Sequence, residues 1–221
     1  MNNNSESAKQ TRKLCEALHA QDRGYKAASN IDFALFLVGL VLVMLIIRAF
    51  IFEPVRVDGP SMMNTLIDGE RCICEKVSHI ITEPKQGDIV IVRFPDRGTQ
   101  AFVKRVIATA GQTVSLGTEI ITDPVTKKST KRYYVIVDGK ELDESAYSDG
   151  FLYDDGASNI PITCEGSSGG SYTVPEGCVF VMGDHRTNSQ DSRRVGAIPL
   201  SDVVGRVHGV MYPFNRIRSV K

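Results

Sequence analysis

The most strongly apolar part of the sequence lies near its N-terminus. The 15 residues from Phe33 to Ile47 carry no charge, and a helix of that length covers only about 22 Å. Continuing the helix through Arg48 to Phe52 gives about 30 Å, which crosses the hydrocarbon of a bilayer if the Arg48 side chain reaches the interface. The pattern therefore predicts a transmembrane anchor over residues 31–52, after a tail over residues 1–30.

Two other interpretations of the apolar run stay open, a cleaved signal peptide and a buried helix of a soluble protein. The sequence after Arg48 is Ala-Phe-Ile-Phe-Glu-Pro, which offers no cleavage site of the small-x-small type. Basic residues outnumber acidic ones before the run, so the positive-inside rule predicts a cytoplasmic N-terminus and an extracytoplasmic domain over residues 53–221. The basic residues are Lys9, Arg12, Lys13, Arg23 and Lys26, and the acidic ones are Glu6, Glu16 and Asp22.

After residue 52 the apolar positions form short runs separated by Gly and Pro, which is typical of β-strands and turns. No long amphipathic pattern follows the anchor. We therefore expect a mainly β domain, either barrel-like or a folded sheet. Residues 116–177 are richer in Ser, Thr, Asp and Gly, and we expect them to form an inserted hairpin region. The predicted strands cover residues 70–77, 88–94, 101–108, 133–137, 179–182 and 203–212.

Charge and cysteine content exclude only a few classes of function. The 26 Lys and Arg residues balance 26 Asp and Glu residues, so nothing suggests nucleic acid as a partner. Cys72 and Cys74 stand two apart in a predicted strand and cannot bond to each other. A disulfide between Cys164 and Cys178 stays open, although free buried thiols are favoured. The spacing of Cys and His matches no metal motif, so no metal or other cofactor is expected.

One lysine lies in an apolar row of a predicted strand. Alternation over residues 101–108 places Phe102, Lys104 and Val106 on one face. A lysine with its ordinary pKa is neutral at pH 7 only about once in a few thousand times, but burial lowers that pKa. Lys104 is therefore a candidate general base. The alternative is an ordinary strand lysine whose amine reaches solvent, and the adjacent Arg105 cannot serve because a guanidinium does not lose its proton.

A candidate nucleophile, Ser61, lies shortly after the anchor in the stretch 58–66. Serine needs a neighbouring base and donors for the oxyanion that its attack creates. A serine beside Gly59 and Pro60 can also be a simple turn residue. The adjacent Met62 and Met63 could pack in the core or line an apolar approach to the site.

A polar loop is predicted over residues 183–193, directly after the strand 179–182. Its short polar side chains can hydrogen-bond to the backbone and to each other. Its charges can pair as Asp191 with Arg193 or as Asp184 with Arg186. A solvated surface loop is the alternative. His185 lacks an evident carboxylate partner, so we expect it and the other three histidines to be structural or exposed.

Together these segments resemble the bacterial type I signal peptidases, or leader peptidases, from the anchor to the C-terminus, with features of the Gram-positive branch. The sequence Ser61-Met62-Met63-Asn64-Thr65-Leu66 matches the family segment S-M-x-P-T-L. Residues 102–107 match F/Y-V-K-R-V-I, and residues 183–193 match G-D-N-R-x-x-S-x-D-S-R.

The resemblance implies a Ser/Lys dyad in which Ser61 is the nucleophile and Lys104 the general base. Ser189 would orient the lysine amine, and Asp191 with Arg193 would support the loop. The oxyanion would bind the Ser61 backbone N–H at a site that includes Gly59, where some relatives have a serine. The implied partners are secretory preproteins, cut after small-x-small sequences such as A-x-A, and the lipid bilayer. We expect a monomer without cofactors.

Four positions depart from the family pattern without touching the dyad: Gly59, Asn64, Gln112 and His185. Two other functions are compatible with parts of this pattern. A membrane-anchored relative without catalysis could assemble surface structures, but the joint presence of Ser61, Lys104 and Ser189 argues against it. A self-cleaving Ser/Lys repressor-type peptidase should be soluble and joined to a DNA-binding domain, which the apolar segment disfavours.

Overall fold

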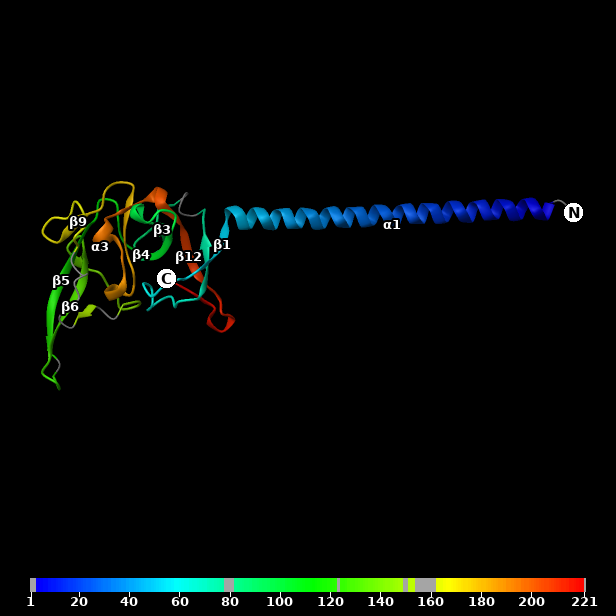
Figure 1. The fold of residues 1–221 in the computed structure, drawn as a ribbon. Coiled ribbons are helices and arrows are strands. Elements are labelled where there is room, and N and C mark those ends of the chain that lie inside the picture. The colour runs from blue at the N-terminus through cyan, green and yellow to red at the C-terminus, as the bar shows by residue number, and fades with distance from the viewer. Residues whose placement is uncertain (1–2, 78–81, 123, 149–150, 154–161, 221) are drawn as a thin grey trace. The chain divides into compact units, whose positions relative to one another are not determined.

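The computed structural model describes residues 3–77, 82–122, 124–148, 151–153 and 162–220. Two compact units divide the chain, Met1–Ala49 and Phe50–Lys221 (Figure 1). The described residues of the first unit form one helix, and those of the second form mostly strands. The prediction of a mainly β domain after an apolar helix is therefore confirmed.

Helix α1 spans Asn3–Phe50. Its segment Asn30–Arg48 has a mean hydropathy of 2.6 over 19 residues, equivalent to about 28 Å of helix. This segment is long and apolar enough to cross a membrane. The helix ends two residues before the predicted anchor does, because Phe52–Arg56 pairs as strand β1 instead. Passage through a membrane stays a prediction.

The larger sheet carries the strands on which the candidate residues depend. In the described residues its order is β1-β2-β12-β3-β4-β10-β11, with β13 added to β12, and every paired neighbour is antiparallel. Strand β4 therefore lies between β3 and β10. The bounds are β1 Phe52–Arg56, β2 Arg71–Glu75, β3 Ile89–Arg93, β4 Ala101–Thr109, β10 Cys178–Met182, β11 Ile198–Pro199, β12 Val203–Tyr212 and β13 Arg218–Ser219.

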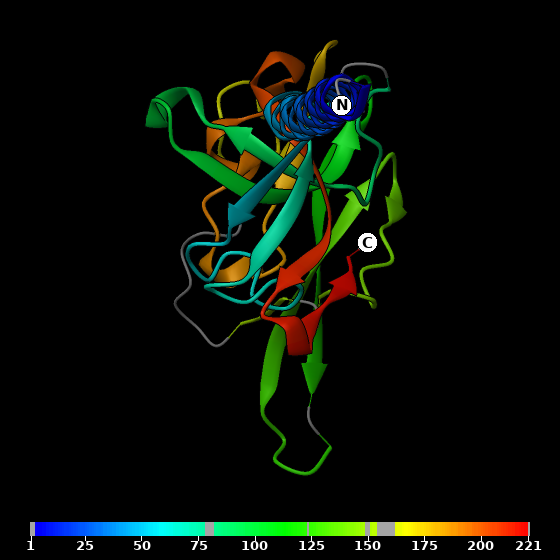
Figure 2. The same ribbon diagram turned by 90° about the vertical axis from the view of Figure 1, so that its right-hand side faces the viewer.

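The second sheet occupies the region where an inserted hairpin was expected. Its order in the described residues is β7-β6-β5-β9, with β8 paired to β6. Figure 2 shows the long β5–β6 hairpin, in green, extending beyond the other strands. The bounds are β5 Thr113–Thr122, β6 Ser129–Val137, β7 Lys140–Glu141, β8 Phe151–Tyr153 and β9 Ser171–Thr173; the short helices are η1 Pro95–Arg97, η2 Arg186–Asn188, α3 Ser192–Val195, η3 Leu200–Asp202 and η4 Phe214–Arg216.

Both faces of the central strands are buried. On β3, Ile89 and Ile91 pack in one apolar cluster, while Val90 and Val92 pack in another on the opposite face. A third cluster joins the two sheets through β4, β10, β5 and β6. Burial on both faces explains why β3 reads as a continuous apolar run, and it makes β4 an interior strand from which polar side chains cannot easily reach water.

The six strands predicted from apolar runs are all present, with ends that differ by a few residues. The prediction did not separately identify β5, whose outer half, Thr118–Thr122, is exposed. A strand without a buried face lacks the alternation on which sequence-based prediction relies. It is stabilised instead by its long pairing with β6.

Gly205 of β12 lies where the backbones of β12 and β2 approach each other closely. A Cβ at Gly205 would lie 2.4 Å from the Glu75 carbonyl oxygen and 2.6 Å from Cys74 Sγ. We expect Gly205→Ala to destabilise the domain by about 1–3 kcal/mol, because the backbone must shift. Thermal unfolding of the full chain in detergent, followed by circular dichroism, measures this as a lower Tm.

Gly117→Ala is the matched control, since Gly117 also lies in a strand. A Cβ there would meet the ring of Tyr134, a partly exposed side chain that can rotate away. We expect its Tm to change by less than half as much. Equal effects of the two substitutions would contradict the close backbone approach at Gly205.

Candidate active site

Ser61 lies in the turn that connects β1 to β2. Hydrogen bonds from Met63 N to Pro60 O at 3.0 Å and from Leu66 N to Met62 O at 2.7 Å hold the turn. The side chains of Met62 and Leu66 anchor it because both are buried, whereas Met63 is 45% exposed. Ser61 itself is half-buried. The turn therefore holds the hydroxyl at the edge of the core.

The Ser61 backbone N–H donates no hydrogen bond within the described residues. In contrast, the Gly59 N–H donates to Asp68 Oδ1 at 2.9 Å. Gly59 has a φ of 93°, which glycine adopts without strain. The Ser61 N–H thus has no acceptor among the described residues, whereas the Gly59 N–H is bound within the turn and leaves open space beside it.

Lys104 lies in β4, on the face that the alternation predicted. Its amine is 5.8 Å from the centroid of the Phe102 ring, and Val106 and Phe102 pack in the same apolar cluster. The lysine is only 1% exposed. The alternative of a strand lysine whose amine reaches solvent is therefore wrong.

The structure brings Lys104 and Ser61 together across 43 positions of sequence, with Nζ 2.7 Å from Oγ. Burial lowers the pKa of Lys104 to about 8, the negative charges of Asp191 and Asp184 partly oppose this, and the positive charge of Arg193 adds to the lowering. At pH 7 a group with that pKa is neutral about one time in ten. A neutral amine at hydrogen-bond distance can accept the serine proton.

The polar loop begins where β10 ends, beside β4. Met182 pairs with Arg105 in the register of these strands, and the next residue, Gly183, meets the serine turn. A Cβ at Gly183 would lie 2.4 Å from the Ser61 carbonyl oxygen and 2.3 Å from Ser189 Oγ. Only glycine allows this contact. The loop is thus packed against the serine turn and is not a solvated surface loop.

Asp191 and Arg193 form the predicted pair inside this loop. Arg193 Nε donates to Asp191 Oδ1 at 2.8 Å and Nη2 donates to Oδ2 at 2.9 Å, with both residues at most 1% exposed. Burial alone would raise the pKa of Asp191, but Arg193, the Ser189 hydroxyl and the Gly183 N–H together hold it below its ordinary value. The charge of this carboxylate is therefore balanced within the loop.

The Ser189 hydroxyl is buried and is not bound in the geometry of a full hydrogen bond to any described residue. It lies near enough to Asp191 to help lower the pKa of that carboxyl. A buried hydroxyl without a good partner is costly and is uncommon in native proteins. The structure shows no hydrogen bond from Ser189 to Lys104, so the orienting role of Ser189 stays a prediction.

Asp184 pairs with Arg105, and the predicted pairing of Asp184 with Arg186 is wrong. Arg105 Nε and Nη2 donate to the two carboxylate oxygens of Asp184 at 2.8 and 2.7 Å. Thr65 of the serine turn also donates to Asp184, and Arg186 pairs with Glu144 instead. Arg105 was excluded as a base because a guanidinium does not lose its proton, and the alternation gave no sign that Arg105 binds the polar loop.

Burial and bonding bear on the histidines and cysteines that the structure describes; His79 lies outside the described residues. The His185 N–H donates to Ser61 O at 3.0 Å and its ring Nδ1 lies 3.1 Å from Pro60 O, so this histidine is structural. All five cysteines are free. Of the pair for which a disulfide stayed open, Cys164 is buried and Cys178 is partly exposed. Burial raises the pKa of both Cys72 and Cys74 to about 11. Within the described ranges, no group of three His, Cys, Asp or Glu side chains could hold a metal.

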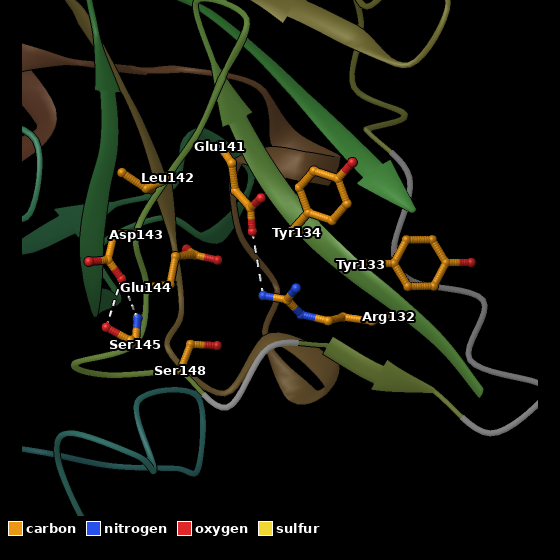
Figure 3. A pocket seen from close by; sticks show the side chains of 9 residues that line it. All are labelled: Arg132, Tyr133, Tyr134, Glu141, Leu142, Asp143, Glu144, Ser145 and Ser148. Atoms are coloured by element: carbon orange, nitrogen blue, oxygen red, sulfur yellow. Dashed lines mark hydrogen bonds and ion pairs between the residues drawn. The ribbon is translucent and has the colours of Figure 1, made fainter. Parts of the chain in front are cut away.

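Two cavities among the described residues lie away from this site. One of about 650 Å³ lies between β6 and the segment 141–148 and is mostly polar (Figure 3). Another, of about 600 Å³, is bordered by Gly87, Arg105 and Tyr147. Neither Ser61 nor Lys104 lines either cavity. The candidate site is identified by its side-chain chemistry.

Comparison with known proteins gives a consistent result. The sequence model of the family described as signal peptidase, peptidase S26, matches residues 30–212. Signal peptidase I T of Bacillus subtilis is 34% identical over 197 residues, which cover 89% of this chain and 92% of that protein. A probable signal peptidase I-1 of Synechocystis is 35% identical over 190 residues, covering 82% of each chain.

A solved structure is also similar in sequence, the crystal structure of a signal peptidase I from Enterococcus faecalis V583. It is 29% identical, covers 57% of this chain and 97% of its own, and gives a TM-score of 0.37. The family match extends from the apolar segment of α1 to the end of β12. The chain therefore belongs to the signal peptidases of the peptidase S26 family.

Proposed function

We propose that this protein is a membrane-bound serine endopeptidase that removes signal peptides from secretory preproteins with a Ser/Lys dyad. The observation that carries the proposal is the 2.7 Å separation of Lys104 Nζ and Ser61 Oγ around an amine that is 1% exposed. Burial makes the amine a usable base near neutral pH. Its family membership supplies the substrate class.

In the proposed reaction, neutral Lys104 takes the proton of Ser61 as Oγ attacks the carbonyl carbon before the scissile bond. The Ser61 N–H stabilises the resulting oxyanion, and Gly59 leaves room for the substrate beside it. Lysine then protonates the departing amine, which leaves an acyl-enzyme on Ser61. Lys104 next takes a proton from water, whose oxygen attacks the ester and releases the signal peptide.

Two further residue roles belong to this proposal. Ser189 Oγ would accept a hydrogen bond from the Lys104 amine and keep its lone pair directed at Ser61. The buried ion pair of Asp191 and Arg193 would keep the loop rigid, because losing one partner leaves an uncompensated buried charge. Both roles use contacts of the same loop.

We further propose the cellular setting. The apolar segment Asn30–Arg48 crosses the membrane, the N-terminus is cytoplasmic, and the β domain acts outside as a monomer. Substrates are cut after small-x-small, A-x-A-like sequences. Confining enzyme and preprotein to one bilayer raises the effective concentration of each for the other.

Removing either member of the dyad should abolish cleavage. We expect Ser61→Ala and Lys104→Ala each to lose about a thousandfold or more in kcat/KM on a preprotein with an A-x-A site. The measurement follows release of the mature protein by the full chain in detergent. Ser201→Ala and Lys131→Ala, at exposed positions, should cleave like the parent protein. Near-normal cleavage by Lys104→Ala would refute the dyad.

The rate should depend on pH through Lys104. Because the neutral amine is the active form and burial lowers its pKa to about 8, kcat/KM should rise with pH and level off above about pH 8. A peptide substrate without titrating groups gives the profile, and circular dichroism at each pH checks that the domain stays folded. If kcat/KM instead rises only near the ordinary pKa of lysine, the base is not buried and the proposal is contradicted.

Ser189→Ala should separate activity from stability. We expect kcat to fall about tenfold or more while Tm stays equal or rises, since the buried hydroxyl lacks a full hydrogen bond. Ser192→Ala is the matched control, because Ser192 Oγ accepts a bond from Val181 N at 3.0 Å. It should lower Tm, since a buried N–H loses its partner. A Ser189→Ala variant with unchanged kcat would argue against the orienting role.

A further inference from the structure

Arg105 follows the candidate base in sequence, and its guanidinium is bound by hydrogen bonds and by an aromatic ring. Its guanidinium binds Asp184 through two bonds and donates to Gly87 O at 2.8 Å. Nη2 also lies 3.3 Å from Thr65 Oγ1. The flat face of the guanidinium stacks on the ring of Tyr147, with Cζ only 3.8 Å from the ring centroid. Tyr147 thus completes the environment of an arginine that is 1% exposed.

Tyr147 also faces a second buried arginine. Arg186 Cζ lies 5.9 Å from the same ring, and Arg186 forms an ion pair with Glu144. Glu144 and Tyr147 share one turn, since the Glu144 carbonyl accepts bonds from Tyr147 N and Ser148 N at 3.1 and 2.8 Å. Burial raises the pKa of Tyr147 to about 12, so the ring stays a neutral phenol whose face attracts both cations.

The turn belongs to the second sheet. Leu142 N donates to Val135 O of β6 at 2.8 Å, and Ser145 bonds to Asp143 through both its N–H and its hydroxyl. Figure 3 shows this segment beside β6, with Asp143 and Ser145 joined and Glu144 between them in sequence. The inserted sheet therefore projects one fixed turn, residues 142–148, toward the two arginines.

Both arginines connect the turn to the candidate site. Arg105 holds Asp184, which in turn accepts a bond from Thr65 of the serine turn. The carbonyl of Arg186 accepts a bond from Arg193 Nη2 at 2.8 Å. The segment 142–148 thus reaches both the serine turn and the polar loop through one arginine each.

We propose that Tyr147 and Glu144 are positioning residues that fix Ser61 and Lys104 in reactive geometry by holding the two buried arginines. The inference rests on the proposed function of the dyad. It gives the inserted sheet a role in catalysis, although neither residue touches the reacting atoms. Removing the ring exposes the guanidinium of Arg105 to water and frees it to move.

The same loss changes the electrostatics around Lys104. The charges that face the amine are those of Asp184, Asp191 and Arg193, and Arg105 balances Asp184 in a pair whose side chains are at most 1% exposed. Water admitted beside Arg105 solvates the ammonium form of the lysine and weakens the effect of burial. A protonated base is then favoured at neutral pH.

The test compares Tyr147→Leu, Tyr147→Phe and Glu144→Gln in the full chain in detergent, on a peptide with an A-x-A site. We expect Tyr147→Leu to lower kcat about tenfold and to leave KM within about twofold. The midpoint of the rise of kcat/KM with pH should move to higher pH by about half a unit or more. Tyr147→Phe keeps the ring face and should recover most of the rate. Glu144→Gln should lower kcat by about threefold or more, since it weakens the partner of a buried charge.

Thermal unfolding separates positioning from simple stability. If Tyr147→Leu loses activity only in proportion to its unfolded fraction, with its pH profile unchanged, the proposal is overturned. A second outcome would overturn this proposal but not the dyad. In it, Tyr147→Leu keeps the kcat and the pH profile of the parent protein, while Ser61→Ala and Lys104→Ala are inactive. Normal cleavage by Lys104→Ala would overturn it together with the proposed dyad.

Discussion

The burial of one amine is the constraint on which the rest of the domain depends. Lys104 lies 2.7 Å from Ser61 in an interior strand, and its pKa is lowered to about 8. At about 1.4 kcal/mol per unit, that lowering costs the folded state on the order of 3 kcal/mol. The penalty is fully present below about pH 8 and fades as the pH rises toward the ordinary lysine value, because the unfolded chain binds the proton more tightly. A domain of ordinary stability must offset this cost elsewhere.

Paired charges surround the buried amine. Arg105 with Asp184 and Arg193 with Asp191 are both almost completely buried. The first pair joins β4 to the polar loop, and the second lies within that loop. Such pairs add little net stability over apolar packing, but breaking one is costly. They therefore favour a single arrangement of the serine turn, β4 and the polar loop. Gly183 makes that arrangement possible, since a side chain there would collide with both serines.

The sequence predicted the parts of this site that follow a local pattern. Alternation in β4 placed Lys104 on an apolar face, and short spacing paired Asp191 with Arg193; both agree with the structure. The pairing predicted for Asp184 was wrong because its actual partner, Arg105, lies 79 positions away in sequence. Only the register of β4 with β10 brings the two residues together. Tyr147 could not be found from sequence, since a lone tyrosine in a polar stretch has no periodicity to mark it.

The second sheet illustrates why local patterns miss such residues. Its outer strands are exposed and are held mainly by backbone pairing, so their sequences carry little information about what the sheet supports. Its inner end differs, because Val114 and Val135 pack against Ile107 of β4 in a shared core. That packing fixes where residues 142–148 emerge relative to β4. The base of the sheet therefore supports the turn that contacts Arg105, next to Lys104, whereas its outer hairpin is held by its own backbone pairing.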